Sequence, residues 1–428
     1  MLLVFFAFIV LILLGMPVAF SIGIAGTLFF AQHLNLPFTI PIQLAISQTQ
    51  NFALLAVPLF IMSGNFMNQS GITERLLRLS TVLTGHMRGG LAQVSIALAT
   101  LMGGVSGSCI ADAAMQTRIL GPEMLKRGFS KGYAAGILSF GSLMTPIIPP
   151  GIGFILYGTV GQVSIGRLFA GGILPGLILW VSLAVTVSLT AKKRGYKPER
   201  PKGPSPREVA SATLGGIWAV LFPVMLLAGL RFGIFTPSEI GAFAVVYSFF
   251  IGVFAYRELG GRAFKEALEG STIDVGAVMF LIALSGIFGY GIVWDRIPEV
   301  FSNVMLGITT NPYVVMILIV IFLLIAGCFI DGSVLIIMLT PIFLPIATEL
   351  GFDPVHFGLV FIITITIGNF TPPVGSAMYA VCSILECDVN DYTLESLPFL
   401  VTVSLVAALL IFFPNVVLFI PDLIFGKG

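Results

Sequence analysis

Uninterrupted apolar runs of roughly 20 residues recur along the whole chain, and no other feature limits its fold as strongly. A helix needs roughly 20 consecutive apolar residues to cross the hydrocarbon core of a bilayer. Hydrophobic residues make up 57% of the chain and charged residues 10%, and the mean hydropathy is +1.05. An ordinary soluble domain has about 45–50% apolar and about 25% charged residues. A β-barrel would show alternating polarity instead. The runs therefore predict an all-α polytopic membrane protein.

Apolar runs and the residues that interrupt them predict about ten spans. Their approximate ranges are 1–14, 17–31, 53–67, 133–157, 168–191, 212–230, 240–256, 272–293, 354–381 and 397–420. Two longer apolar blocks, about 90–127 and 312–350, are each interrupted near the middle by glycine and serine, in "GGVSGSCIAD" at 103–112 and "GCFIDGS" at 327–333.

Lysine and arginine distribution predicts the orientation, because cytoplasmic loops of membrane proteins are enriched in these residues. Seventeen of the 21 basic residues fall within the ranges 75–88, 118–131, 192–207 and 257–265, which the span count places on one side. We therefore expect the basic loops, including 192–208, to be cytoplasmic. Both ends of the block 90–127 then lie inside and both ends of 312–350 outside. Each block must enter and return on its own side as a re-entrant hairpin.

A fixed offset of 223 residues relates the two halves of the chain. It aligns Phe129 with Phe352, Pro150 with Pro373 and Pro175 with Pro398. The pattern predicts two inverted repeats, a layout that many secondary transporters share. Each repeat has three spans, a hairpin and two spans. The first covers 1–191, with the hairpin at about 90–127 and a broken helix at about 133–157. A basic linker covers 192–211, and the second repeat covers 212–428, with the hairpin at about 312–350 and a broken helix at about 354–381.

Four breaks in the apolar pattern carry the candidate chemistry: the two hairpin tips, "TPIIPPG" at 145–151 and "GNFTPPVG" at 368–375. Proline frees backbone carbonyls, and inside a bilayer freed groups must find partners or line a polar cavity. Carbonyls and hydroxyls suit Na⁺, and exposed helix N-termini suit an anion. The hydroxyls come from Ser106, Ser108, Thr145, Ser333 and Thr371.

Two carboxylates lie at the predicted depth of the membrane, where ionisable groups are costly and usually functional. For Asp331, at a hairpin tip, direct cation contact and helix capping remain equal alternatives. Asp112 lies one turn beyond its tip, and we expect it to stabilise the hairpin structurally. The three histidines are dispersed and the four cysteines match no zinc or disulfide spacing, so the chain predicts no transition-metal site. The net charge of +1 gives no indication of nucleic-acid binding.

The motifs "SGSCIAD" at 106–112, "PIIPPGIGFILYG" at 146–158, "FIDGS" at 329–333 and "FTPPVG" at 370–375 together resemble the large membrane subunit of TRAP (tripartite ATP-independent periplasmic) transporters. The resemblance covers about residues 15–420. It implies an elevator mechanism and import of an organic acid, a C4-dicarboxylate or a sialic acid, coupled to Na⁺ in a bacterial or archaeal inner membrane. A periplasmic binding protein would deliver the substrate, and a small four-span membrane subunit would be a separate chain.

The resemblance also implies site residues. Two or more Na⁺ ions would be the only cofactors, with no organic cofactor. The first Na⁺ site would comprise Ser106, Gly107, Ser108, Thr145, Ile148 and Pro149. The second would comprise Gly327, Asp331, Gly332, Ser333, Thr371, Pro372 and Pro373. The substrate would lie near Ser108, Pro150, Gly151, Ser333, Pro373 and Gly375, although relatives often have serine where this chain has Gly151.

Two other kinds of protein are alternatives to this interpretation. One is a stand-alone Na⁺/dicarboxylate symporter or anion exchanger of similar architecture, which would need no binding protein. The other is an intramembrane enzyme or a channel, which we do not expect because the chain has no HExxH or GxSxG motif and no paired His–Asp constellation.

Overall fold

The computed structural model describes residues 1–33, 35–309 and 311–427, except for the side chains of residues 305, 306 and 308, and it forms helices without strands over those ranges. Within the described part, seven helices are long and apolar enough to cross a membrane. Helices α11 (Pro206–Gly215) and α12 (Ile217–Arg231), bent by 65°, add an eighth if they form one span. The all-α membrane class is therefore confirmed. The count is below ten because several expected spans consist of shorter apolar helices.

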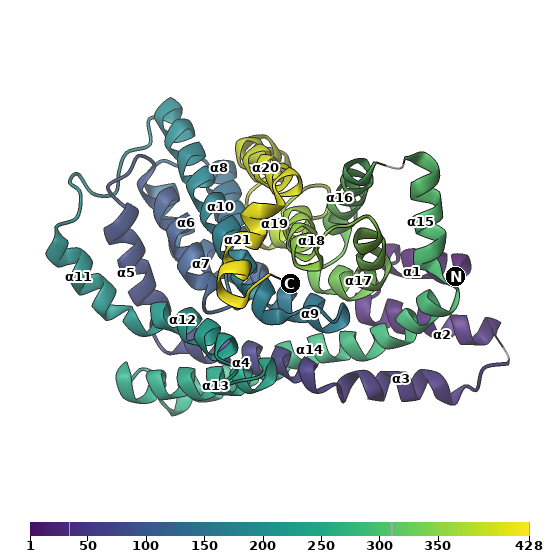
Figure 1. Cartoon of the computed structure of the whole chain (residues 1–428). Coiled ribbons are helices and arrows are strands. Elements are labelled where there is room, and N and C mark those ends of the chain that lie inside the picture. Colours follow the sequence, from purple (N-terminus) through teal and green to yellow (C-terminus); the bar gives the residue numbers. More distant parts are fainter. Residues whose placement is uncertain (34, 310, 428) are drawn as a thin grey trace.

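One layer of the molecule runs along the bottom of Figure 1. It contains α1 (Leu2–Leu13), α2 (Val18–Gln32), α3 (Thr39–Thr49), α4 (Ala56–Gln69), α12, α13 (Pro237–Phe250) and α14 (Gly261–Trp294), with the short helices η1 (Phe52–Leu55) and η3 (Ile251–Ala255) before α4 and after α13. The 34-residue helix α14 packs against α2, α3 and α4, and α13 packs against α4. We call this group the lower layer. Helix α3 was not expected from the sequence.

The remaining long helices form a bundle above the lower layer (Figure 1). From the first half come α6 (Gly90–Gly103), α7 (Cys109–Lys126), α8 (Lys131–Gly141), η2 (Ser142–Met144), α9 (Ile152–Val160) and α10 (Ile165–Arg194). From the second half come α16 (Pro312–Phe329), α17 (Gly332–Glu349), α18 (Pro354–Asn369), α19 (Ser376–Leu385), α20 (Val389–Phe412) and α21 (Pro414–Phe425). The span expected at about 397–420 is present with other bounds: α20 covers Val389–Phe412, and a proline begins the separate helix α21.

Corresponding helices of the two halves begin with the same kind of cap. Ser130 accepts a hydrogen bond at the start of α8, and Asp353, 223 residues later, does so at the start of α18. Both helices are buried along almost their whole length, so they form the centre of the bundle. Their sequences are apolar on all sides, as burial on every face requires. The peptide bonds Pro149–Pro150 and Pro372–Pro373 are both cis.

Two amphipathic helices connect the lower layer to the bundle. Helix α5 (Ile72–Thr84) contacts α4 of the layer and α6 of the bundle, and α15 (Ile297–Ile308) contacts α14 of the layer and α17 of the bundle. They lie at opposite ends of the molecule in Figure 1. Each is the only helix between a lower-layer span and a hairpin within the described chain.

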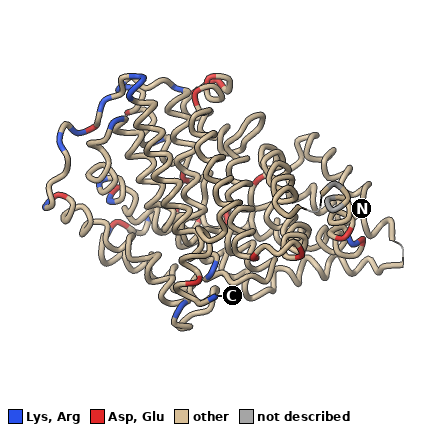
Figure 2. The backbone as a smooth tube through the Cα atoms, turned by 45° about the horizontal axis from the view of Figure 1, so that its top comes forward, with Lys and Arg blue, Asp and Glu red and all other residues tan. Residues whose placement is uncertain are grey.

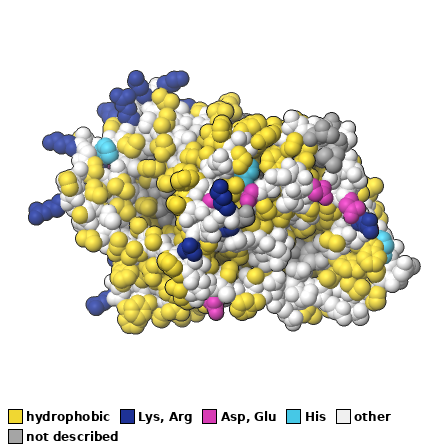
Figure 3. All heavy atoms as spheres, in the orientation of Figure 1, with side chains coloured by type: hydrophobic (Ala, Val, Ile, Leu, Met, Phe, Trp, Pro, Cys, Tyr) yellow, Lys and Arg dark blue, Asp and Glu magenta, His cyan; other side chains and the backbone are white. Residues whose placement is uncertain are grey.

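Many of the Lys and Arg residues gather at one end of the protein, whereas Asp and Glu are spread over the molecule (Figure 2). Figure 2 shows Lys and Arg along the segment that joins α10 to α11. Hydrophobic side chains cover broad areas of the face drawn in Figure 3. Along α10, Leu177, Val181, Val185 and Leu189 are all exposed at intervals of four residues, which places them on one stripe of the helix. Such a stripe is suited to contact with lipid or with another membrane helix.

Candidate functional site

A cavity of about 460 Å³ lies between the lower layer and the bundle. Helices α4 and α14 line it from the layer side. Both hairpin tips, the start of α9 and the end of α18 line it from the bundle side. The cavity therefore brings together residues from both halves of the sequence.

The first hairpin tip, residues 104–108, reaches the cavity between α6 and α7. The hydroxyl of Ser108 caps α7 and accepts a hydrogen bond from the backbone N–H of Ala111 at 3.5 Å. Gly107 has a φ of +64°, and a Cβ there would lie 2.8 Å from the carbonyl oxygen of Pro150, so glycine permits the tip to pack on the double proline. Ser106 lines the cavity, and its Oγ is buried with no hydrogen-bond partner among the described residues.

The second tip, residues 330–333, meets the end of α18. The Oδ1 of Asp331 accepts a hydrogen bond from the backbone N–H of Ser333 at 2.9 Å, so Asp331 caps α17 while also lining the cavity. Gly327 packs against the backbone of α18, because a Cβ there would lie 2.7 Å from the Ile365 carbonyl oxygen. The side-chain oxygen of Asn369 is buried and has no hydrogen-bond partner within the described chain.

The two tips offer the same combination of groups. Each directs a helix N-terminus, of α7 or α17, at the cavity, and a helix N-terminus carries partial positive charge that attracts an anion. Beside each N-terminus lies one unpaired oxygen, on Ser106 or on Asn369. Neutral oxygen ligands suit hard cations, so these groups fit Na⁺. No group of three or more His, Cys, Asp and Glu able to hold a metal ion occurs in the ranges described.

Asp112 belongs to a hydrogen-bonded chain behind the first tip. The hydroxyl of Thr145 donates to Asp112 Oδ2 at 2.7 Å, and the side-chain amide of Gln116 donates to the same oxygen at 2.8 Å. Ser95 of α6 donates in turn to Gln116 at 2.9 Å. All four side chains are buried. The chain ties both arms of the hairpin to the segment that follows η2.

Part of the expected site does not line the cavity. Ser106, Gly107, Ser108, Asp331, Gly332 and Ser333 do line it. The other expected residues lie behind or beside it: Gly327, Thr145, Ile148, Pro149, Pro150, Gly151, Thr371, Pro372, Pro373 and Gly375. The hydroxyl of Thr145 is a donor to Asp112, and that of Thr371 is a donor to the Ile367 carbonyl at 2.7 Å.

Gly151 has a steric role in this chain. A Cβ at this position would lie 2.1 Å from the carbonyl oxygen of Pro146, closer than real Cβ atoms come to any backbone atom. A serine at this position would therefore require the backbone of this segment to shift.

Several lining residues were not singled out from the sequence. They are Asn65, Asn68, Pro146, Asp274, Thr366 and Asn369. Asn369 stands inside the "GNFTPPVG" break. Asn65 is a polar residue within the expected span 53–67, and Asn68 follows the end of that span, so both signals were present. Asp274 is a carboxylate within the expected span 272–293. The Nδ2 of Asn65 donates to Asp274 Oδ2 at 3.0 Å, a contact across 209 residues of sequence.

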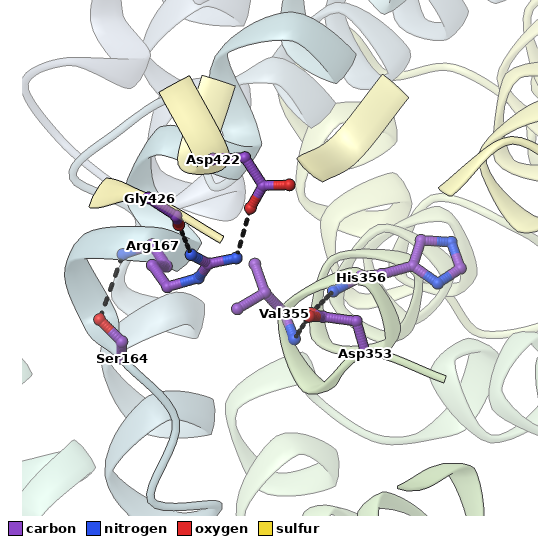
Figure 4. Close-up of polar contacts among 7 residues, drawn as sticks. All are labelled: Ser164, Arg167, Asp353, Val355, His356, Asp422 and Gly426. Carbon is purple, nitrogen blue, oxygen red and sulfur yellow. Dashed lines mark hydrogen bonds and ion pairs between the residues drawn. The ribbon is translucent and has the colours of Figure 1, made fainter. Parts of the chain in front are cut away.

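A second cavity of about 540 Å³ is lined by two charged residues, Arg167 and Asp353. Arg167 pairs with Asp422 at 2.7 Å and also donates to the carbonyl of Gly426, so its charge is compensated by the C-terminal helix (Figure 4). Asp353 accepts hydrogen bonds from the backbone of Val355 and His356 as the cap of α18. Both charged groups therefore have structural partners.

Comparisons with known proteins agree with the geometry. The family model described as "Tripartite ATP-independent periplasmic transporter, DctM component" matches residues 5–416. The sialic acid TRAP transporter large permease protein SiaM of Vibrio cholerae is 34% identical, over 99% of each chain. The 2,3-diketo-L-gulonate TRAP transporter large permease protein YiaN of Escherichia coli is 31% identical over 95% of each chain. The C4-dicarboxylate TRAP transporter large permease protein DctM of Vibrio cholerae is 30% identical, over 99% of this chain and 98% of its own length.

A solved structure supports the fold independently. The YdaH transporter of Alcanivorax borkumensis, described as having an unusual topology, superposes with a TM-score of 0.65 over 87% of each chain at 15% identity. The family and the relatives are transporter components rather than enzymes, and they do not favour a stand-alone symporter or exchanger. The chain belongs to the DctM family, the large permease subunits of tripartite ATP-independent periplasmic transporters.

Proposed function

We propose that this large permease subunit imports an organic acid together with Na⁺. The observation that carries the proposal is the pair of hairpin tips, each with a helix N-terminus and an unpaired buried oxygen at one cavity. The N-termini favour the carboxylate of the substrate, and the oxygens of Ser106 and Asn369 favour the cation. The named substrates of the relatives are sialic acid, 2,3-diketo-L-gulonate and C4-dicarboxylates, all organic acids.

The movement proposed is an elevator motion of the bundle against the lower layer. The two parts meet at the cavity, and α5 and α15 connect them at opposite ends of the molecule. An amphipathic helix at the membrane interface can change its tilt while keeping both ends attached, which suits such connectors. Basic residues on the segment between α10 and α11 support an orientation with that segment in the cytoplasm and the protein in an inner membrane (Figure 2).

The proposed partners are a separate small membrane subunit of four spans and a periplasmic binding protein that delivers the substrate. One relative, the isethionate TRAP transporter permease protein DctMQ of Oleidesulfovibrio alaskensis, is 32% identical over 96% of this chain and 65% of its own length. Its additional length leaves room for a second component in the same polypeptide. The exposed apolar stripe on α10 offers a surface for lipid or for a membrane partner.

The test is uptake into proteoliposomes that contain the large subunit, a candidate small subunit and the binding protein, with the Na⁺ concentration varied. Ser106→Ala and Asn369→Ala each remove one cation ligand worth about 1–2 kcal/mol, so the Na⁺ concentration for half-maximal uptake should rise about five- to thirtyfold. Ser80→Ala is the matched control, because Ser80 also has a buried unpaired hydroxyl but lies on α5, away from the cavity.

Two results would contradict the proposal. An unchanged Na⁺ dependence in both Ser106→Ala and Asn369→Ala would exclude these oxygens as ligands. Full uptake by the large subunit alone would instead establish a stand-alone symporter or exchanger.

A further inference from the structure

The central cavity has a carboxylate on each of its two walls. Its described lining contains two carboxylates, Asp274 and Asp331, and no Lys, Arg or His. Asp331 lies on the bundle side, where it caps α17 beside the N-terminus of that helix. Asp274 lies on α14 of the lower layer, opposite the tips. An acid bound by its carboxylate at the helix N-termini would therefore point its other end toward a carboxylate.

Asp274 retains hydrogen-bonding capacity. A carboxylate has two oxygens with about four acceptor positions, and the contact from Asn65 to Oδ2 occupies one of them. Unlike the buried Asp112, Asp274 has its side chain exposed at the cavity. Asn65 and Asn68 present two further amides on the same wall. The layer side of the cavity is thus rich in acceptors and uncharged donors.

The bundle side of the cavity contains a buried acceptor, the side-chain oxygen of Asn369. Asn369 is only 3% exposed, and its side-chain oxygen lacks a partner within the described chain although it lines the cavity. A buried polar atom without a hydrogen-bond partner lowers stability, so a bound ion or molecule that pairs with the Asn369 oxygen would be stabilised at this wall.

These two walls discriminate between classes of organic acid. A dicarboxylate held at the tips would bring its second negative charge toward Asp274, which is repulsive. The Na⁺ proposed at Ser106 and Asn369 would lie on the bundle side beside the first carboxylate, and no basic residue lines the layer side to offset the second. An acid with one carboxylate and several hydroxyl groups would instead donate hydrogen bonds to Asp274, and bonds to a charged acceptor are the strong ones. The Asn65 amide would hold the carboxylate in place for them.

We propose that Asp274, positioned by Asn65, is a specificity-determining residue that selects polyhydroxylated monocarboxylates, the sugar-acid class, over C4-dicarboxylates. This rests on the proposed function, since it assumes that an organic acid binds in the central cavity.

The experiment measures binding by titration calorimetry to the purified full chain in detergent, with Na⁺ and with Na⁺ replaced by K⁺. The probes are N-acetylneuraminate and gluconate as hydroxylated monoacids, and succinate and fumarate as dicarboxylates. The wild type should bind a hydroxylated monoacid more tightly than either dicarboxylate. Asp274→Asn should weaken binding of that monoacid about tenfold and strengthen succinate binding by a similar factor, since a bond to a charged group is lost and a repulsion removed.

Glu269→Gln is the matched control. It removes one carboxylate from the same helix, but Glu269 is exposed, pairs with Lys265 and does not line the cavity, so its affinities should equal those of the wild type. Tighter binding of succinate than of both monoacids by the wild type would overturn the inference. So would an Asp274→Asn protein that elutes as a folded monodisperse species and keeps the wild-type ratio of affinities. Na⁺-dependent binding with the wrong preference overturns only this inference, whereas the absence of Na⁺-dependent binding of any acid overturns the proposed function too, so the two failures are distinguishable.

Discussion

Removal of the Thr145 hydroxyl is the sharpest test of how the first hairpin is held. Thr145→Val keeps the size and β-branching of the side chain but leaves the buried Asp112 carboxylate with one donor, Gln116, in place of two. The other oxygen of Asp112 has no partner among the described residues, and the neighbouring Ser142 hydroxyl already donates to the Leu138 carbonyl at 2.9 Å. Measured at about pH 9, where the carboxyl group of Asp112 is ionised, the free energy of unfolding should fall by about 1.5–3 kcal/mol, the contribution of a hydrogen bond to a charged group.

Ser95→Ala provides the scale for this measurement. It breaks the neutral bond at the other end of the same chain, from Ser95 to Gln116, and a neutral bond contributes about 1 kcal/mol. The free energies are measured by unfolding the purified variants in mixed micelles with increasing denaturing detergent. A loss in Thr145→Val no larger than that in Ser95→Ala would refute the argument that Asp112 holds the hairpin through a charge-assisted bond.

Two further variants test other parts of the structure. Gly151→Ser should reduce Na⁺-dependent uptake rather than improve it, because its Cβ would lie 2.1 Å from the Pro146 carbonyl oxygen and displace the segment beside the first tip. Uptake equal to that of the wild type would contradict this steric argument. Arg167→Met should loosen the attachment of α21 to α10, because it removes the 2.7 Å ion pair with Asp422. Amide hydrogen exchange should therefore accelerate in α21 and stay unchanged in α20. Equal protection of α21 in the variant and the wild type would contradict the prediction.

Local chain properties were sufficient to predict the class of the protein and the positions of its breaks. Apolar runs of spanning length require helices in a bilayer, because only a helix satisfies its own backbone there. Glycine, serine and double proline interrupt those runs, and the structure ends or begins helices close to each expected break, at Gly103, Cys109, Ile152, Gly332 and Asn369. Such signals are readable from sequence because they act within a few residues of the chain.

The partners of individual side chains depended on the tertiary structure. Thr145 and Thr371 are hydroxyl-bearing residues at equivalent kinds of break, yet one donates to Asp112 and the other to its own helix, and neither lines the cavity. Asn65 and Asp274 form a pair only because α4 and α14 pack side by side in the lower layer. The sequence by itself determined where the helices break. The packing of helices decided which oxygens remain unpaired, because hydrogen bonding and burial depend on contacts between segments that are 33 residues apart for Thr145 and Asp112 and 209 apart for Asn65 and Asp274.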